Sequence, residues 1–390
     1  MPSTLNILTT KVLPRLLFGQ YLAAQFELLQ KKAKETGITT TIHFYSRVTD
    51  IVDQPEQNTV QVEINETDTT EFDIIILCTG HHWPSKEKNP GYFDSPYPPS
   101  KLAQPFNHPV AIRGASLTAI DAIRTLARQH GVFKKKESGK LIYRVNEDAG
   151  DFKIVMHSRN GLLPAIRFHL EDSHLSKDSL LSKEDLAIHM KSNDGFLSLD
   201  FIFEKDFKEP IRQKEPAFYE QIKNMQLEEF VDTMMALRES VDAFDLFKGE
   251  YAQAEKSIRR KESVYWKEML ATLSFAMNYP AKHLSAEDML RLQNVLMPLI
   301  SIVIAFVPQS SCEELISLHD AGLLELISVG NDSKVVVNPE GGIIYHLTDE
   351  NSNSISTKYV TYIDCVGQPH LSIEKFPFRS PVKSGTVSAA

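Results

Sequence analysis

The sequence has few cysteines and no long apolar run. Its three cysteines, Cys78, Cys312 and Cys365, lie far apart, and no Cys-x-x-Cys or Cys/His ligand spacing surrounds them. Such a scattered, odd-numbered set predicts buried thiols in a reducing compartment rather than a disulfide framework or a metal site. The most apolar stretch, 296–307, is too short to span a membrane and is broken by Pro298. Because a signal-peptide pattern is also lacking at the N-terminus, we expect a soluble cytoplasmic protein without a membrane partner.

The sequence also lacks an excess of positive charge. Its net charge is −9 at pH 7 and its pI is about 5.8, whereas a surface that binds nucleic acid needs a basic face. No Walker loop and no catalytic triad is evident. The negative charge argues against nucleic acid as the main partner, and a small-molecule substrate is expected instead. Hydrophobic residues make up 42% of the 390 residues, which is enough for two or three domains, or for one large domain with an insertion.

The first part of the chain combines a helical pattern with short β-like runs. Apolar residues at three- and four-residue spacing, closed by a glycine, predict an amphipathic helix over 19–37. Short runs predict strands over 40–45, 58–64 and 72–78. The last of these, FDIIILC, is interpreted as a buried strand. A connection rich in proline and aromatic residues follows over 80–109.

The rest of the chain changes character twice. A strand over 110–114, a helix over 116–131 and a strand over 152–158 are expected, with a hairpin or loop at KKKESGK. From about 171 to 307 the pattern is helical. Strand patterns return in LLELISVG, SKVVVNP, GGIIYHL and KYVTYIDCVG. We therefore expect β-rich parts that are interrupted by a helical insertion.

The segment VAIRGASLTAIDAIRTLARQHG has the layout of a dinucleotide-binding strand, turn and helix. Gly114 permits a tight turn and close backbone approach, and the helix start offers free N–H groups and partial positive charge to a pyrophosphate. Ser116 stands where G-x-G-x-x-G would have its second glycine. Two interpretations stay open, a nucleotide site and an ordinary unit whose serine caps the helix. In the first, the residues at the pyrophosphate are Gly114, Ala115, Ser116, Leu117 and Thr118.

The next strand indicates which dinucleotide would bind. It ends in Ser158 and Arg159, at the place where an NAD site usually carries an acid for the ribose 2′-hydroxyl. An arginine there accommodates a 2′-phosphate instead, so these two residues favour NADP over NAD. Arg167 is a second candidate. The alternative is that Arg159 is an ordinary surface arginine.

Five blocks occur in an order known from one family. They are FDIIILCTGHHWP, VAIRGASLTAIDAIRTLARQHGVF, IVMHSRNGLLPAIR, FVPQSSCEELISLHDAGLLEL and YIDCVGQP. Together they resemble the FAD/NAD(P)-binding flavoproteins with two dinucleotide-binding domains, whose relatives include FAD-dependent urate hydroxylase-like and aspartate N-monooxygenase-like enzymes. The resemblance spans nearly the whole chain. It implies an α/β, Rossmann-like fold, FAD and NADP as cofactors, and NADPH-dependent flavin reduction of a monooxygenase-like type.

In such flavoproteins the NADP domain is inserted into the FAD domain, so the chain crosses between them twice. LCTGHHWP resembles the first crossing, with Cys78 in place of alanine, and DCVGQP resembles the return. Glycine at each crossing lets the backbone approach the cofactor. The resemblance thus places Thr79, Gly80, Gly367 and Gln368 against the flavin.

The resemblance also implies how the chain is divided. The expected parts are 1–84 (partial FAD-binding domain), 85–170 (NAD(P)-binding part), 171–307 (helical insertion), 308–361 (return strands of the NAD(P)-binding domain) and 362–390 (truncated return to the FAD domain).

The sequence departs from the family at both ends. The expected opening strand with G-x-G-x-x-G is not there, since RLLFGQYL resembles a helix that comes well after it, and PFRSPVKSGTVSAA ends before the last FAD segment. A fragment, a mispredicted gene or a truncated form is the simplest explanation. We expect this chain alone to bind FAD weakly or not at all.

Several other residues have two interpretations each. His81, His82 and Trp83 follow the first crossing, where they either line the cofactor junction or are ordinary loop residues. Asp121 either orients the neighbouring loop or is a solvated helix acid. For Arg124 and Arg128 of the same helix a solvated face is expected.

The function expected from these patterns is that of an FAD/NAD(P)-binding oxidoreductase of unknown substrate. The alternative is a truncated, inactive nucleotide-binding or interaction module. The sequence identifies neither a catalytic residue nor the oligomeric state.

Overall fold

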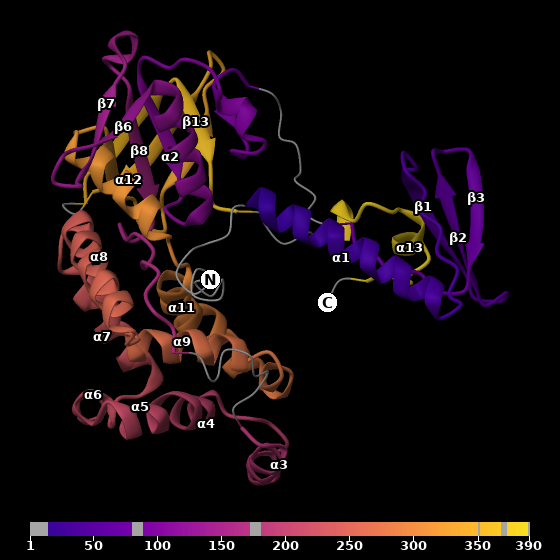
Figure 1. Ribbon diagram of the computed structural model, residues 1–390. Coiled ribbons are helices and arrows are strands. Elements are labelled where there is room, and N and C mark those ends of the chain that lie inside the picture. Colours follow the sequence, from indigo (N-terminus) through magenta and orange to yellow (C-terminus); the bar gives the residue numbers. More distant parts are fainter. Residues whose placement is uncertain (1–14, 80–88, 172–180, 350–351, 368–372, 389–390) are drawn as a thin grey trace, which may run out of the picture. The chain divides into compact units, whose positions relative to one another are not determined.

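The computed structural model describes residues 15–79, 89–171, 181–349, 352–367 and 373–388. The chain divides into two compact units. The first holds the described residues between 88 and 367, and the second holds those between 12 and 87 and those after 367. Figure 1 shows that each unit has its own β-sheet. The five domain boundaries expected from the sequence stay predictions.

The first unit is built on a parallel sheet with the strand order β4-β13-β5-β8-β9. The strands are β4 (Tyr92–Phe93), β5 (Pro109–Arg113), β8 (Lys153–Ser158), β9 (Leu324–Ser328) and β13 (Thr361–Asp364). Val110, Ile112 and Ile154 have no exposed surface. Apolar runs of this kind are typical of parallel strands that are covered on both faces. The strands expected at 110–114 and 152–158 are therefore confirmed.

Different elements cover the two faces of this sheet. Helices α2 (Leu117–His130) and α12 (Gln309–Asp320) pack on one face, where they share a core with Val110 and Ile154 (Figure 1). An antiparallel meander packs on the other face, where its residues cluster with Ala111 and Val155. Its strands are β10 (Lys334–Val337), β11 (Ile343–Thr348) and β12 (Ser354–Tyr359). The α/β fold class with a Rossmann-like sheet is confirmed.

The predicted hairpin after α2 is also confirmed, and its packing explains why Gly131 is a glycine. It consists of β6 (Gly131–Lys135) and β7 (Leu141–Val145). Gly131 has an extended backbone and starts β6, so it is not a left-handed cap of α2. A Cβ at this position would lie 2.4 Å from both the Arg144 carbonyl oxygen and the Tyr143 hydroxyl. Close packing of the hairpin against the end of α2 therefore requires this glycine.

The helical insertion expected between β8 and β9 is confirmed. Its helices are α3 (Lys183–Ser192), α4 (Leu199–Ile202), α5 (Glu209–Lys214), α6 (Pro216–Ile222), α7 (Leu227–Glu239), α8 (Ala243–Arg260), α9 (Tyr265–Ala276), α10 (Ala286–Arg291) and α11 (Met297–Ile304). Two π-helical segments, η4 (Phe203–Lys208) and η6 (Leu292–Leu296), interrupt it. Short 3₁₀ turns in the first unit are η2 (Pro99–Leu102), η3 (Glu147–Ala149) and η5 (Pro280–His283). In the described part of the chain, no helix combines the length and apolarity needed to cross a membrane.

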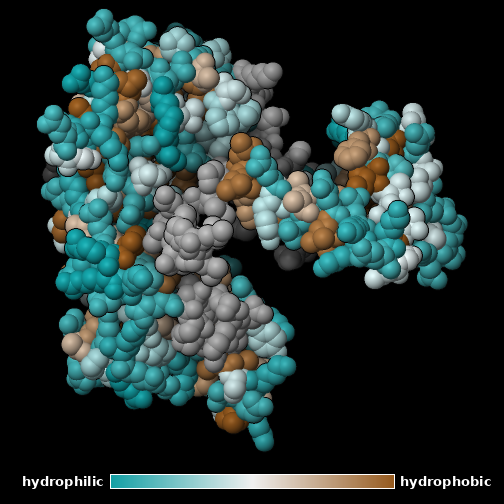
Figure 2. Space-filling model, in the orientation of Figure 1, coloured by the Kyte–Doolittle hydropathy of each residue, from teal (hydrophilic) through white to brown (hydrophobic). Residues whose placement is uncertain are grey.

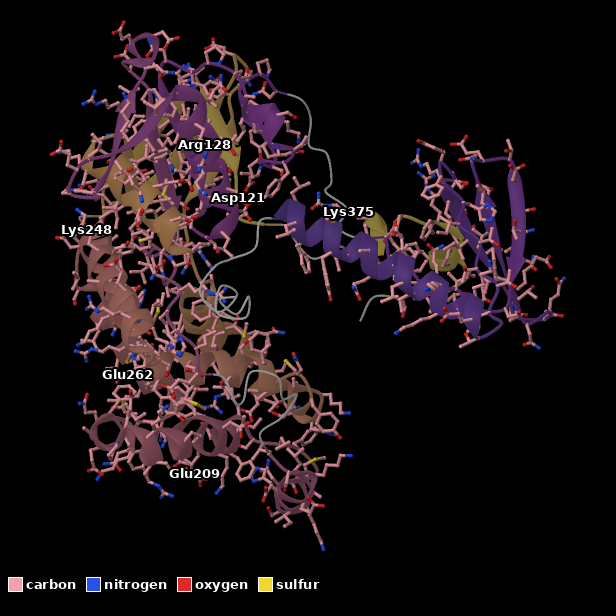
Figure 3. All side chains as sticks on the ribbon, in the orientation of Figure 1. Asp121, Arg128, Glu209, Lys248, Glu262 and Lys375 are labelled. Atoms are coloured by element: carbon pink, nitrogen blue, oxygen red, sulfur yellow. The ribbon has the colours of Figure 1, made fainter. Side chains whose placement is uncertain are left out.

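The insertion has its own apolar core and two attachments to the sheet. The outgoing and returning segments lie side by side, because the Val307 amide donates to the Ala165 carbonyl at 2.9 Å. Helix α8 packs on α12, where the Lys248 ammonium lies 3.0 Å from the Asp320 carboxylate. Figure 3 labels Lys248 and Glu262 near the two ends of α8. Both attachments tie the helical region to the sheet within one unit.

The second unit is smaller. It contains α1 (Arg15–Glu35), an antiparallel meander of β1 (Val48–Gln54), β2 (Thr59–Ile64) and β3 (Asp68–Phe72), a 3₁₀ turn η7 (Ile373–Lys375) and α13 (Ser380–Lys383). Its buried apolar residues are Ile51, Val62 and Phe378. The Ser380 hydroxyl donates to Asp50 at 2.6 Å and so ties the end of the chain to β1. The predicted helix 19–37 and strand 58–64 are confirmed.

Two of the strands predicted for this unit are wrong. Residues 40–45 form no strand, and β1 begins later. Residues 73–79 also form no strand, and the predicted 72–78 run contributes only Phe72 to β3. A buried strand needs hydrogen-bonding neighbours and covered faces. Among the described residues, no backbone group hydrogen-bonds to 74–78, and Cys78 is exposed rather than buried.

Candidate dinucleotide site

The strand order of the parallel sheet reverses between β5 and β13. From β5 the chain proceeds outward to β8 and then β9, and it later returns to β13 on the opposite side of β5. In open α/β sheets, ligands bind outside the carboxyl ends of the strands at such a reversal. Arg113 and Asp364 stand side by side in register at these two strand ends. The candidate site is the space beyond these two strand ends, where the fold rule places a ligand, and it is called the crevice below.

Gly114 shapes this crevice. It follows β5 with φ +108°, a backbone conformation that favours glycine. A Cβ at this position would lie 2.9 Å from the Cys365 carbonyl oxygen. The Gly114 amide donates to the His157 carbonyl at 2.8 Å, which fixes the turn against β8. The tight turn that the sequence led us to expect at Gly114 is therefore present, and the chain just after β13 passes close to it.

The start of α2 lies directly beside this turn. Ser116 occupies the N-cap position with an extended backbone, but its side chain makes no capping hydrogen bond. The interpretation of Ser116 as a simple helix cap is therefore not supported. Ala115 is buried, Ala119 has no exposed surface, and Ser116 and Leu117 are exposed. The first turn of α2 thus presents N–H groups and the positive end of the helix dipole beside the crevice.

The end of β8 forms the adjacent part of the edge. Ser158 is 8% exposed, and its hydroxyl has no hydrogen-bond partner among the described residues. The Arg159 side chain is exposed, and within the described ranges no carboxylate lies within ion-pair distance of it. The Gly330 amide donates to the Arg159 carbonyl at 2.9 Å and holds this strand end in place. Arg167 lies further along, where its amide donates to Val307.

Helix α2 also contacts its neighbours through charged side chains. The Tyr97 hydroxyl donates to Asp121 at 2.6 Å, which supports the interpretation that Asp121 orients the preceding connection. The solvated face expected for Arg124 and Arg128 is present at Arg128, which is exposed, whereas Arg124 is half-buried, and both donate to Glu314 on α12, Arg128 at 2.6 Å and Arg124 at 2.7 Å. Figure 3 shows Asp121 near the start of α2 and Arg128 further along it.

Sequence reasoning missed the polar residues at the carboxyl edge of the sheet that lie on the side covered by the β10–β12 meander. Arg113 pairs in register with His157 on one side and with Asp364 on the other. The His157 ring stacks on the Tyr345 ring, and the two ring centroids lie 4.2 Å apart. Burial lowers the pKa of His157 to about 4. His157 is therefore neutral at pH 7. A polar residue at or next to the end of each of the strands β13, β5 and β8 is the signal that would have identified this row.

Only two of the residues expected at the flavin, Thr79 and Gly367, lie within the described structure, and they belong to different units. Thr79 is exposed in the second unit, and Gly367 has φ +89° with open space where a Cβ would be. Gly80 and Gln368 lie outside the described residues, as do His81, His82 and Trp83. In the described part of the second unit all strand pairs are antiparallel. The assignment of Thr79, Gly80, Gly367 and Gln368 to the flavin therefore stays a prediction.

Comparisons with known proteins extend this picture. Residues 2–82 match the family described as FAD-NAD(P)-binding, and residues 182–304 match the YdhS-like middle domain. The uncharacterized protein YdhS of Escherichia coli (strain K12) is 28% identical over 374 residues. The matched region covers 94% of this chain and 67% of YdhS.

Two solved structures are more distantly similar. The ornithine N-hydroxylase KtzI of Kutzneria sp. 744 is 12% identical with a TM-score of 0.34, and the match covers 90% of this chain and 60% of KtzI. The cadaverine monooxygenase DfoA of Erwinia amylovora, bound to FAD, is 12% identical with a TM-score of 0.32, over 85% of this chain and 54% of DfoA. The chain thus spans less than two thirds of either protein, and likeness at these scores carries no argument. The expected resemblance to the FAD/NAD(P)-binding family is confirmed by the match of residues 2–82, and the chain is similar to YdhS over nearly its whole length.

Proposed function

We propose that this chain binds NADPH at the crevice between β5 and β13, as part of a flavin-dependent oxidoreductase of monooxygenase-like type. The turn at Gly114 is the observation that carries the proposal, because a side chain there would collide with β13 and the start of α2 lies directly beside it. The match of residues 2–82 to the FAD-NAD(P)-binding family supports the flavin part. The substrate is a small molecule of unidentified class.

Each proposed residue has one task at this site. The backbone at Gly114, Ala115 and Ser116 and the first turn of α2, with Leu117 and Thr118, bind the diphosphate through N–H groups. Arg159 binds the 2′-phosphate, and Ser158 contributes its hydroxyl at the same strand end. NADPH supplies a hydride when it is bound, and the role of these residues is to hold and orient it.

A glycine comparison tests the site. Gly114→Ala places a methyl group 2.9 Å from the Cys365 carbonyl at a positive φ, whereas Gly139→Ala places one at a positive φ in open space on the β6–β7 hairpin. We expect Gly114→Ala to weaken NADPH binding at least about tenfold in calorimetric titration, because the turn must open. Gly139→Ala is expected to bind as the parent does. Equal NADPH affinity for the parent and Gly114→Ala would contradict the proposed site.

An arginine comparison tests the preference for NADP. Arg159→Ala is expected to lose about tenfold or more in NADPH affinity and little in NADH affinity, because only NADPH carries the 2′-phosphate. Arg144→Ala removes another exposed arginine of the same unit and serves as the control. If Arg159→Ala binds NADPH as tightly as the parent does, the 2′-phosphate assignment is wrong.

One observation favours a second candidate function. Residues 73–79 form no strand, and Ile74 and Ile76 are 79% and 83% exposed, so this segment is not the buried strand that was expected to end beside a flavin. This agrees with an inactive nucleotide-binding or interaction module. NADPH oxidation measured with added FAD separates the two candidates. Turnover above that of free FAD supports the oxidoreductase, and NADPH binding without turnover supports the module.

A further inference from the structure

A row of polar residues ends three neighbouring strands of the parallel sheet. Asp364, Arg113 and His157 lie in register on β13, β5 and β8. The row that lies two residues earlier on the same face consists of Tyr362, Ala111 and Val155, which belong to the core beneath the β10–β12 meander. Side chains alternate along a strand. Arg113 therefore emerges on the meander side of the edge at which α2 begins.

The Arg113 guanidinium is held but incompletely paired. Its side chain is 42% exposed, and its Nη1 lies 4.0 Å from the Asp364 carboxylate, a long distance for an ion pair. Within the described chain, no other ion pair of Arg113 is found. Burial opposes its positive charge, but the phenol of Tyr362 and the carboxylate of Asp364 outweigh burial and raise the pKa of Arg113. The guanidinium is thus a cation held near the Tyr362 and Tyr345 phenols, and its ion pair with Asp364 is a long one.

Its position in the chain places Arg113 next to the turn at which the diphosphate is proposed to bind. Arg113 immediately precedes Gly114, and consecutive Cα atoms are about 3.8 Å apart. His157 does not compete as a cation, because it is buried and neutral at pH 7. The N–H groups at the start of α2 approach the crevice from one face of the sheet, and Arg113 rises from the other. An anion above Gly114 would lie between the two.

We propose that Arg113 is a second anchor for the dinucleotide diphosphate, and that Asp364 partly offsets its positive charge. This inference rests on the proposed function, since it concerns the same nucleotide. It assigns the diphosphate to Arg113 and leaves the 2′-phosphate to Arg159. The competing explanation is an ion pair that only joins β5 to β13.

Calorimetric titration with NADPH and with NADH distinguishes these roles. Arg113→Gln is expected to weaken both nucleotides by about tenfold and by similar factors, because both carry the diphosphate. Arg159→Ala is expected to weaken NADPH alone. The loss in Arg113→Gln should shrink at high salt, where the interaction between the two charges is screened. Unchanged affinity for both nucleotides in a folded Arg113→Gln protein would overturn the inference and leave the proposed function standing.

A second variant tests the inference even if Arg113→Gln does not fold. Asp364→Asn removes the counter-charge and keeps the guanidinium, so both nucleotides are expected to bind more tightly, by about two- to fivefold. An ion pair that only joins the strands leads to unchanged or weaker binding, and that result would overturn the inference. If the parent binds neither nucleotide, the proposed function itself fails.

Discussion

Two segments of this chain have similar apolar sequences but lie in different environments. In the first unit, Val110, Ala111 and Ile112 of β5 have no exposed surface. In the second unit, Ile74 and Ile76 are 79% and 83% exposed and form no strand. Figure 2 shows further apolar side chains, in brown, on the surface of α1 in the second unit, where Leu16 and Phe26 are 77% and 54% exposed.

The difference shows what an apolar run requires before it becomes a strand. Strand β5 has β13 and β8 as hydrogen-bonded neighbours, helices on one face and a meander on the other. Among the described residues, no backbone group pairs with 74–78. Hydrophobicity favours burial, but backbone N–H and C=O groups also need partners. An apolar run that lacks hydrogen-bonded neighbouring strands and elements packed on its faces forms no strand.

Placing a carboxylate in each run should separate the two environments most strongly. Ile112→Asp puts an unpaired charge at a site without exposed surface, so we expect a loss of more than about 5 kcal/mol and no folded first unit. Ile76→Asp is expected to change stability by less than about 0.5 kcal/mol, because the side chain is already in water. Circular dichroism during thermal unfolding measures both. If Ile76→Asp also unfolds the protein, the exposed environment of that segment is wrong.

The buried ions of the helical region should show the second largest effect. Glu250 lies 2.6 Å from Arg238 and 2.7 Å from Lys267, and all three side chains are at most 8% exposed. Glu250→Gln leaves two buried cations without a counter-charge, and the expected loss is about 3–5 kcal/mol in urea unfolding. The control is Glu340→Gln, whose pair with Lys358 is exposed and is expected to contribute less than about 1 kcal/mol. Equal losses would contradict the burial of this cluster.

Two aspartates should give the units opposite responses to pH. Burial raises the pKa of Asp206 in the first unit to about 7. Because the folded form keeps its proton longer than the unfolded chain, this contribution to stability is present below about pH 4 and is lost as pH rises toward 7. Burial opposes the ionisation of Asp50 in the second unit, but hydrogen bonds from Ser380 outweigh it and lower the pKa of Asp50. That contribution is present at neutral pH and is lost below about pH 4.

The two pH responses can be followed separately. Trp266 fluorescence in a Trp83→Phe background reports urea unfolding of the first unit, and amide exchange along β1 reports the second. Asp206→Asn is expected to flatten the loss of stability between pH 4 and 7 in the first unit only. Asp50→Asn is expected to remove the acid sensitivity of β1. A parent first unit whose stability does not fall between pH 4 and 7 would contradict the burial of Asp206.

Local patterns were sufficient to predict much of the fold. The glycine after a short apolar strand predicted the turn at Gly114, and three- and four-residue spacing predicted α2. Long-range partners were not visible in these patterns. Glu314 is far from Arg124 and Arg128 in sequence, so nothing local showed that it binds both. In the same way, the apolar letters of 72–78 did not show whether neighbouring strands pair with them.

Residues of the candidate site that belong to one local turn could be predicted from the sequence. Residues that are brought together only by the pairing of distant strands could not. Ser116 and Arg159 follow from their places after strands. The row formed by Asp364, Arg113 and His157 depends on the register of three strands that are distant in the chain. No periodicity specifies this register, because it results from the packing of the whole sheet.

The central claim is that the crevice at Gly114 binds NADPH through both its diphosphate and its 2′-phosphate. Calorimetric titration of the parent chain with NADPH and NADH, repeated with Arg159→Ala, tests this most directly. We expect one saturable NADPH site per chain, tighter than that for NADH, and a preference that disappears in Arg159→Ala. No saturable binding of NADPH by the folded parent, or a preference that survives in Arg159→Ala, would contradict the claim.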